Sequence, residues 1–176
     1  MQIQKGKYRV EDRCLHFDLI DDLDLINIGS CFYFRGENGF GKTSFLEKII
    51  IPALGVADVH YLYIGQDIRT QLYTLKALLS VRGYKVSHTD EVELLKLWVN
   101  HGQSARVFIL DEFDKYFPDY EFIYDWSKSF IQTYIIVSHR SHLPPDEIAQ
   151  KYGVNQIKFE LIDFDGRLKH IRVGKE

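Results

Sequence analysis

The sequence lacks the features that mark secreted, membrane-spanning or nucleic-acid-coating proteins. Its two cysteines, Cys14 and Cys31, are too few for a disulfide framework and too scattered for a zinc site, so a reducing compartment is expected. No apolar run approaches the roughly 18 residues that a membrane-spanning helix needs, and the polar, basic stretch 1–10 is not a secretory signal. The net charge of −3 argues against capture of nucleic acid by a broad cationic face. Nucleic acid is expected only through a partner or a local patch.

The composition is that of a folded protein. The hydrophobic content is 45% and the aromatic content is 14%, which argues against disorder. A chain of 176 residues suits a single domain with a substantial core, and no repeats, low-complexity tracts or linkers interrupt it. We therefore expect one domain over residues 1–176. It is expected in the cytoplasm, either free or at the inner face of a membrane beside another subunit that supplies the span.

One glycine-rich segment has the pattern of a phosphate-binding loop. The pattern G-x-x-x-x-G-K-[ST] runs from Gly36 to Thr43, directly after the apolar run Cys31 to Phe34. In such a loop, glycines let consecutive backbone N–H groups surround the phosphates of a nucleotide at the positive end of the next helix. Lys42 then reaches the β- and γ-phosphates, and Thr43 offers its hydroxyl to Mg²⁺. The residues expected to bind the nucleotide here are Gly36, Asn38, Gly39, Gly41, Lys42, Thr43 and Ser44.

The hydrophobic pattern predicts strands that alternate with helices. Strands are expected over residues 15–19, 23–25, 31–34, 59–64, 107–110, 134–137, 156–161 and 168–173. The first two are expected to form an antiparallel edge. A helix is expected over 42–51, ended by Pro52 and Gly55, with others over 121–130 and from 144 to Gly153.

A short helical insert is expected at about residues 68–103. Leu72, Leu75 and Leu79 share one helical face there, as do Val92, Leu95 and Val99 on a second helix. The predicted fold is therefore an α/β P-loop NTPase fold, in which helices flank a mainly parallel sheet with an antiparallel N-terminal edge. In such a sheet, ligands bind beyond the carboxyl ends of the strands.

Side chains that could take part in catalysis or metal binding follow three of the predicted parallel strands. Asp111 and Glu112 come directly after 107–110, so Asp111 is expected to hold Mg²⁺ and Glu112 to orient the attacking water. An acidic helix start on the surface is the alternative. His139 follows 134–137 and is expected to hydrogen-bond the γ-phosphate. Gln66 follows 59–64 and can accept from water or coordinate Mg²⁺ through its amide oxygen. The predicted catalytic residues are Glu112, His139 and Gln66, and the predicted metal ligands are Thr43, Gln66 and Asp111.

The order of these motifs resembles the nucleotide-binding domain of ATP-binding cassette (ABC) ATPases over nearly the whole chain. The matching segments are 36–43 as Walker A, 64–67 as Q-loop, 108–112 as Walker B with its catalytic glutamate, and 137–140 as H-loop. The closing hairpin around 164–167 is similar to the family's C-terminal strands. The resemblance implies ATP and Mg²⁺ as cofactors. It also implies that Tyr8 stacks on adenine, although a tyrosine with no such role is equally compatible with this position.

The sequence departs from the family at the signature motif. Leu-Ser-Gly-Gly-Gln is absent, and the best-placed substitute is the segment 86–90. Within it, Ser87 can cap the next helix and offer its hydroxyl and nearby N–H groups to a nucleotide held by another subunit, or it is a plain helix cap. Asp114 and Asp119 are the nearest counterparts of the family's D-loop aspartate, and neither has the usual spacing.

The resemblance implies an enzyme that binds and hydrolyses ATP as half of a head-to-tail dimer. A second copy or a different partner completes each ATP site, and membrane transport, with a membrane subunit as partner, is the family's most common use. The short insert and the missing signature favour a non-transport role in nucleic-acid repair, chromosome maintenance or defence. A regulatory module with little turnover is a further alternative, as is a helicase or AAA protein with Arg140 as arginine finger.

Overall fold

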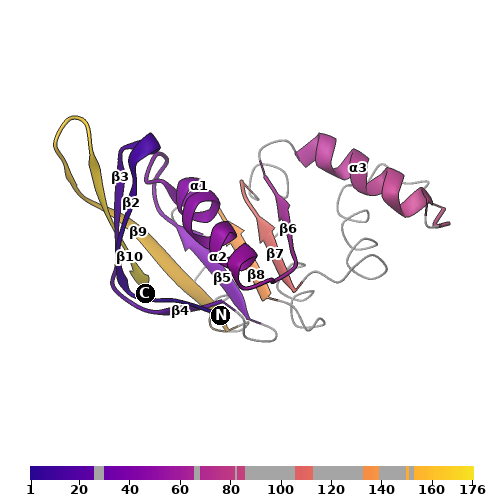
Figure 1. The fold of residues 1–176 in the computed structure, drawn as a ribbon, viewed down its shortest axis with the longest axis horizontal. Coiled ribbons are helices and arrows are strands. Elements are labelled where there is room, and N and C mark those ends of the chain that lie inside the picture. The colour runs from indigo at the N-terminus through magenta and orange to yellow at the C-terminus, as the bar shows by residue number, and fades with distance from the viewer. Residues whose placement is uncertain are drawn as a thin grey trace.

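A mixed sheet lies at the centre of the protein (Figure 1). A computed structural model describes residues 1–25, 30–65, 68–81, 83–85, 106–112, 133–138, 150 and 153–176. Within these ranges the strands are β1 (Gln2–Ile3), β2 (Gly6–Val10), β3 (Leu15–Leu19), β4 (Leu23–Asp24), β5 (Cys31–Arg35), β6 (Tyr61–Ile64), β7 (Val107–Leu110), β8 (Thr133–Val137), β9 (Val154–Phe164) and β10 (Lys169–Lys175). The helices in these ranges are α1 (Lys42–Phe45), α2 (Ile51–Val56) and α3 (Ile68–Val81), with a 3₁₀ turn at Glu11–Arg13 and a π-helical turn at Leu46–Ile50.

Five neighbouring strands of this sheet are parallel. Their order is β9-β5-β8-β7-β6. Every residue of β7 and β8 and four of the five residues of β5 are buried, as expected for apolar strands covered on both faces. The carboxyl ends of β5, β7 and β8 therefore lie at one edge of the sheet, where the glycine-rich loop and the acidic pair begin. This arrangement confirms the predicted P-loop NTPase fold class.

The other half of the sheet is formed by both ends of the sequence. In it β3 pairs antiparallel with β2 and parallel with β10, and β10 pairs antiparallel with β9. The predicted pairing of 15–19 with 23–25 is wrong, because β4 pairs with β1 in a separate two-stranded sheet. All five residues of β3 find a partner in β2, in register from Gly6 to Val10, so β2 offers a longer ladder than β4 can. The antiparallel N-terminal edge exists, with β2 as its outer strand.

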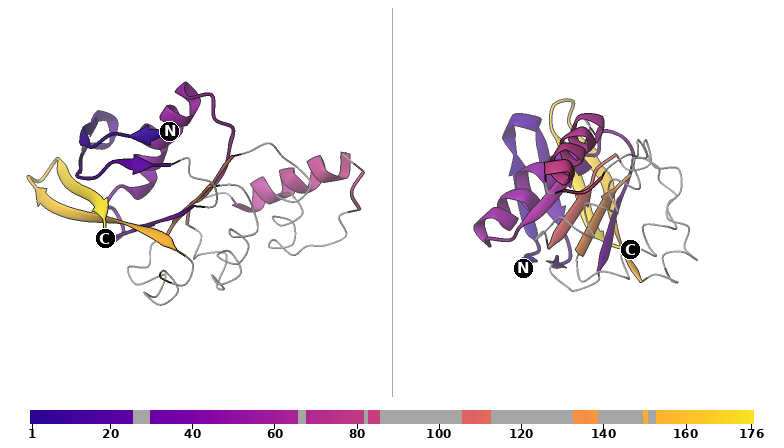
Figure 2. Two further views of the ribbon diagram at one scale, coloured as in Figure 1. Left: turned by 90° about the horizontal axis from the view of Figure 1, so that it is seen from below. Right: turned by 90° about the vertical axis from the view of Figure 1, so that its right-hand side faces the viewer.

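A helix after the phosphate loop covers one face of the sheet (Figures 1 and 2). It runs from α1 through the π-helical turn into α2 and ends at Val56, five residues beyond the predicted end. Pro52 does not end it, because this proline lies at the start of α2, directly after the widened turn. A proline ring normally clashes with the carbonyl group four residues earlier. A π-helical turn changes that spacing, so the helix tolerates Pro52.

Helix α3 begins the predicted insert. Leu75 and Leu79 are buried, as their shared helical face predicts. The second predicted helix of the insert and the helices expected over 121–130 and 144–153 lie outside the described residues, apart from isolated positions. In the described parts of the chain, no helix combines the length and apolar character required to cross a membrane.

Candidate nucleotide site

The glycine-rich loop has the backbone conformation that its sequence predicts. Gly36 has φ 149° and Gly41 has φ 74°, values that side chains of other residues rarely allow. There is also no room for a side chain at Gly36, because a Cβ atom there would lie 2.6 Å from the carbonyl oxygen of Phe159. A Cβ atom at Gly41 would lie 2.9 Å from the ring of Phe17. The loop therefore packs directly on β9 and β3, and both glycines are required by close approach as well as by torsion.

Lys42 lies over this loop rather than in solvent. Its side chain is 3% exposed, and its Nζ donates to the carbonyl oxygens of Gly36 at 2.5 Å and Glu37 at 3.0 Å. Because Lys42 is the first residue of α1, its ammonium group and the helix N-terminus place positive charge at one point. The loop can bind an anion such as a phosphate group there.

Asp111 and Thr43 meet beside the loop. Asp111 follows β7, is 1% exposed, and its carboxyl interacts with the side chain of Thr43. It also accepts hydrogen bonds from the hydroxyl of Tyr63 at 3.1 Å and from the backbone N–H of Glu112 at 3.0 Å. Burial raises the pKa of the Asp111 carboxyl, and these hydrogen bonds oppose that rise. The structure thus brings together Thr43 and Asp111, two of the three residues predicted as metal ligands.

The paired oxygens of Asp111 and Thr43 fit a magnesium ion. Mg²⁺ is usually bound by one or two carboxylates together with substrate phosphates and water, not by a cage of protein ligands. Among the described residues there is accordingly no group of three or more His, Cys, Asp or Glu side chains arranged to hold a metal ion. A divalent cation bound here would favour the charged form of the buried Asp111 carboxyl.

Glu112 has a backbone conformation that is uncommon for its residue type. Its φ is 53°, in the left-handed region that favours glycine. Such conformations are unfavourable by roughly 1–3 kcal/mol and gather at functional sites, where the surroundings hold them. Glu112 is half-buried.

A pocket of about 320 Å³ opens on one side of the phosphate loop. The residues that line it come from the loop, from the turn between β2 and β3, and from the β9–β10 hairpin. They are Arg13, Cys14, Leu15, Gly39, Gly41, Lys42, Thr43, Ser44, Arg167 and Lys169. Four of the ten are cationic and none is a carboxylate, so the pocket suits an anionic ligand. Its size is within the range of small-molecule sites.

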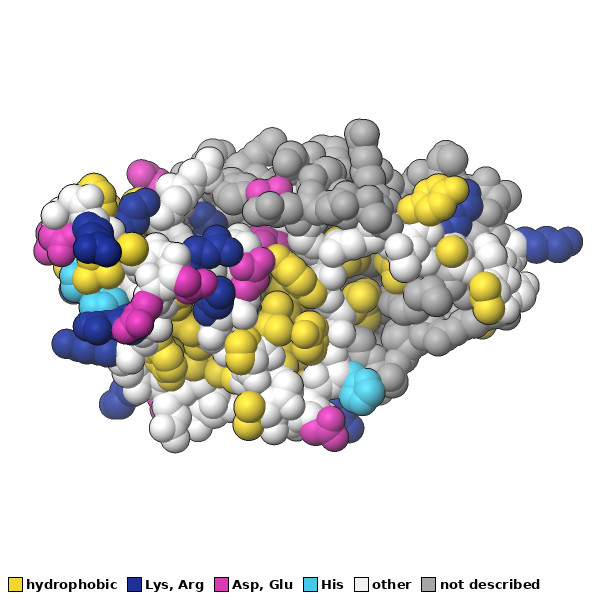
Figure 3. Space-filling view, turned by 45° about the horizontal axis from the view of Figure 1, so that its top comes forward, with side chains coloured by type: hydrophobic (Ala, Val, Ile, Leu, Met, Phe, Trp, Pro, Cys, Tyr) yellow, Lys and Arg dark blue, Asp and Glu magenta, His cyan; other side chains and the backbone are white. Residues whose placement is uncertain are grey.

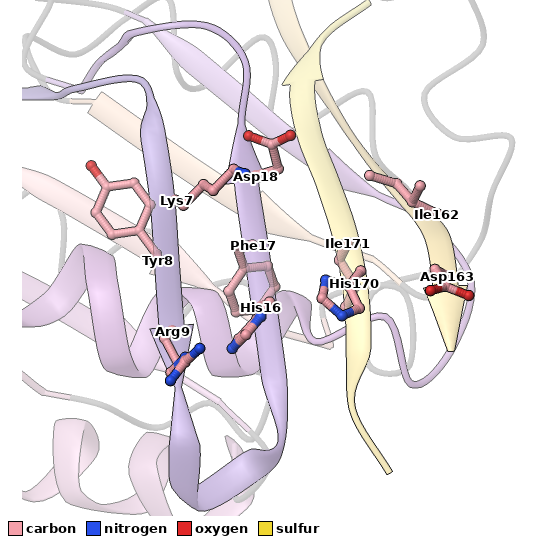
Figure 4. A pocket seen from close by; sticks show the side chains of 10 residues that line it. All are labelled: Lys7, Tyr8, Arg9, His16, Phe17, Asp18, Ile162, Asp163, His170 and Ile171. Carbon is pink, nitrogen blue, oxygen red and sulfur yellow. The ribbon is translucent and has the colours of Figure 1, made fainter. Parts of the chain in front are cut away.

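Tyr8 is not among the residues that line this pocket. It lies on β2, where its hydroxyl donates to the carbonyl oxygen of Gln4 at 2.5 Å and its ring packs against the core. Figure 4 shows Tyr8 at a different hollow, with His16 and His170 nearby. The structure therefore does not bring Tyr8 to the phosphate loop, and the turn residue Arg13 faces the pocket instead.

Several predicted site residues lie outside the described part of the chain. These are Gln66, Ser87, His139, Arg140, Asp114 and Asp119. The residues just before two of them are described: β6 ends at Ile64, and Ser138 follows β8 with its N–H donating to the carbonyl of Phe34. Roles for Gln66, Ser87 and His139 remain predictions.

Sequence reasoning missed the residues that approach the site from other elements. Tyr63 was part of a predicted strand, and alternation along that strand shows only that it faces the same way as Tyr61. Arg13, Arg167 and Lys169 lie in or beside turns, and the β3–β10 pairing brings those turns together. Basic residues in two turns were the available signal, but the pattern holds no information on which turns meet.

Comparisons with known proteins leave the family open. No family model matches the sequence, and no curated protein matches it. Eighty chains of solved structures match the fold. One is a KaiC-like protein from the hyperthermophilic archaeon Pyrococcus horikoshii OT3, with 12% sequence identity, a TM-score of 0.49, and coverage of 84% of this chain and 80% of that one.

Proposed function

We propose that this protein binds and hydrolyses ATP as an ATPase of the ABC type. The observation that carries the proposal is the contact between Thr43 and Asp111, which joins the end of the phosphate loop to the acidic pair after β7. A surface glycine turn and an unrelated acidic helix start have no reason to meet in this way. Nucleotide hydrolysis requires both, because the phosphates and their metal ion must be held at one point.

The proposed mechanism divides the work among the residues of the site. The backbone N–H groups of the loop and the ammonium of Lys42 bind the β- and γ-phosphates. Asp111 and Thr43 would hold Mg²⁺, which would neutralise the charge that builds up on the phosphate oxygens. Glu112, one residue further along the chain, accepts a proton from the attacking water and orients it. Its backbone conformation, unfavourable for a glutamate, is consistent with a functional position.

The ABC assignment is supported by the order of the motifs along the chain. In this proposal a second copy or another subunit closes over the ATP, and hydrolysis reopens the interface to perform work on a partner. Service as the ATPase subunit of a membrane transport system is the proposed role. The missing signature sequence favours a second candidate, a non-transport ABC ATPase in repair, chromosome maintenance or defence.

The test separates binding from hydrolysis with two substitutions. Lys42→Ala should abolish measurable ATP binding in a calorimetric titration, because it removes the buried cation of the loop. Glu112→Gln should keep ATP binding and lower the hydrolysis rate by about a hundredfold or more, as expected for loss of a general base. Steady-state phosphate release in the presence of Mg²⁺ measures the rate.

Glu160→Gln is the matched control for the glutamate variant. Glu160 lies on β9 in an exposed ion-pair group with Lys158 and Arg172, outside the pocket. It should hydrolyse ATP like the unmodified protein. If Glu112→Gln hydrolyses ATP at the unmodified rate, Glu112 has no part in the mechanism. If Lys42→Ala binds ATP normally, the loop is not the nucleotide-binding site.

A further inference from the structure

The cationic pocket borders the phosphate loop on a side that the acidic pair does not line. Thr43 contacts Asp111 and also lines the pocket, whereas Asp111 and Glu112 do not line it. A metal ion bound to a nucleoside triphosphate bridges oxygens of the β- and γ-phosphates. The Asp111 side therefore corresponds to the γ-phosphate end of a nucleotide. The pocket then lies where the α-phosphate and the nucleoside must extend.

Lys169 connects three segments around this pocket. Its backbone N–H donates to the carbonyl of Cys14 at 3.1 Å, which joins β10 to the turn before β3. Its Nζ donates to the carbonyl of Gly39 at 3.0 Å, which joins β10 to the phosphate loop. An ammonium group has three N–H donors, and the Gly39 carbonyl accepts from one of them. Lys169 is thus anchored at the loop with its charge at the pocket wall.

Arg13 and Arg167 complete the cationic wall from two different turns. Arg13 is held by Glu47 at 3.5 Å, so the turn is tied to the helix that follows the loop. Lys48 and Asp12 form a second tie at 2.5 Å. Arg167 lies in the β9–β10 turn, where the Asp165 carboxylate accepts hydrogen bonds from the N–H groups of Arg167 and Leu168 at 2.9 and 2.7 Å. Figure 3 shows Lys, Arg and His side chains gathered at the end of the molecule that carries these hairpins.

We propose that Lys169 and Arg167, with Arg13 on the facing wall, bind the nucleoside of the nucleotide whose phosphates the loop holds. The inference rests on the proposed nucleotide-binding function of the loop. A guanidinium group is suited to this position because it donates to oxygen atoms of a sugar or base and also stacks on the flat face of a base. The described lining of the pocket contains no aromatic side chain that would do so instead.

The test compares two probes, Mg-ATP and inorganic tripolyphosphate, by calorimetric titration. Tripolyphosphate has the phosphate chain without the nucleoside, so the loop alone should account for most of its binding. Lys169→Gln should weaken ATP binding on the order of tenfold, as for loss of a charge-assisted hydrogen bond. Arg167→Gln should weaken it about threefold, because its side chain is more exposed. Tripolyphosphate affinity should change by less than about twofold in both variants.

Lys158→Gln and Arg172→Gln are the matched controls. Both residues are exposed members of the same hairpin, pair with Glu160, and lie outside the pocket. They should bind both probes like the unmodified protein. Arg167→Gln keeps the test valid if Lys169→Gln fails to fold, since Arg167 makes its contacts in the turn through its backbone.

Two results would overturn the inference. If the hairpin variants lose affinity equally for ATP and for tripolyphosphate, the hairpin binds phosphate or supports the loop and does not bind the nucleoside. If their ATP affinity is unchanged, the hairpin takes no part in the site. Failure of the proposed function looks different. In that case Lys42→Ala would leave the binding of both probes unchanged, whatever the hairpin variants do.

Discussion

The carboxyl group of Asp111 is almost completely shielded from water. Its pKa is raised above the ordinary value of 3.8, chiefly by burial. The charged form is therefore less favourable in the folded protein than in the unfolded chain. Burial of this carboxylate stabilises a metal complex at the expense of the metal-free fold.

We expect Asp111→Asn to stabilise the metal-free protein at neutral pH while lowering Mg²⁺-dependent hydrolysis on the order of a hundredfold. A raised folded pKa has no effect on stability below pH 3.8, where the group is protonated in both states. As pH rises through that value, the unfolded chain releases the proton first and folding becomes less favourable. The gain in melting temperature from Asp111→Asn should thus appear at pH 7 and shrink towards zero as the pH falls below 4. Thermal unfolding without metal or nucleotide at several pH values measures it, and a gain that grows towards acid pH would contradict it.

Side chains whose roles follow from position along one strand or loop were predictable. Lys42, Thr43 and Asp111 were named from the sequence because each directly follows a recognisable apolar strand or glycine pattern. Tyr63 and Lys169 were not, because their roles depend on contacts with residues more than 45 positions away, at Asp111 and Gly39. Local patterns hold no information on such contacts.

Strand β9 packs against the phosphate loop through Phe159. The ring of Phe159 lies 5.4 Å from those of Phe34 and Phe45 and 6.3 Å from that of Phe17. These four rings come from β9, β5, α1 and β3, so the cluster joins the loop's own strand and helix to both hairpins. The carbonyl of Phe159 also limits the space at Gly36.

Phe159→Ala should destabilise the protein by roughly 3–5 kcal/mol, the usual effect of removing a buried phenylalanine ring. Phe164→Ala is the control on the same strand, since Phe159 is 1% exposed and Phe164 is 51% exposed. We expect the control to change stability by less than about 0.5 kcal/mol. Urea unfolding followed by circular dichroism measures both. Similar effects of the two substitutions would show that the cluster does not support the fold in this way.

Predicted elements agree best with the structure where apolar periodicity is strong. The strands at β3, β5, β7 and β8 and the buried face of α3 were predicted from alternation, continuous apolar runs and helical spacing. The end of the helix after the loop was predicted wrongly. The proline at position 52 follows a π-helical turn, which the sequence pattern does not indicate. Strand β2 was not predicted, since its residues Lys7 and Arg9 are charged and exposed on an edge.

The order of strands in the sheet depends on the whole chain. The alternation of strands and helices predicted a mainly parallel sheet, and the five strands from β9 to β6 confirm it. The insertion of β10 between β3 and β9 was not predictable, because the parallel β3–β10 pair joins segments about 150 residues apart. Hydrophobic pattern marks which face of each strand is buried, not which strands are neighbours.

We expect Glu112→Gln to form a dimer when Mg-ATP is present. The slow hydrolysis of this variant should keep the ATP-bound, closed form populated, whereas the unmodified protein with ADP should remain monomeric. Analytical ultracentrifugation should show a doubling of mass for Glu112→Gln with ATP. A variant that binds ATP at saturation and still sediments as a monomer would refute closure between two copies, and would leave a different subunit as the partner.

The pocket wall combines Arg13 from an early turn with Lys169 at the start of β10. During synthesis on the ribosome, the phosphate loop emerges long before β10, so it first appears without the facing wall. In the proposed site, nucleotide would therefore stabilise the nascent chain fully only after β10 has left the ribosome and paired with β3. In the cell, chains that stop short of β10 would gain little protection from nucleotide, and proteases would remove them while sparing complete ones.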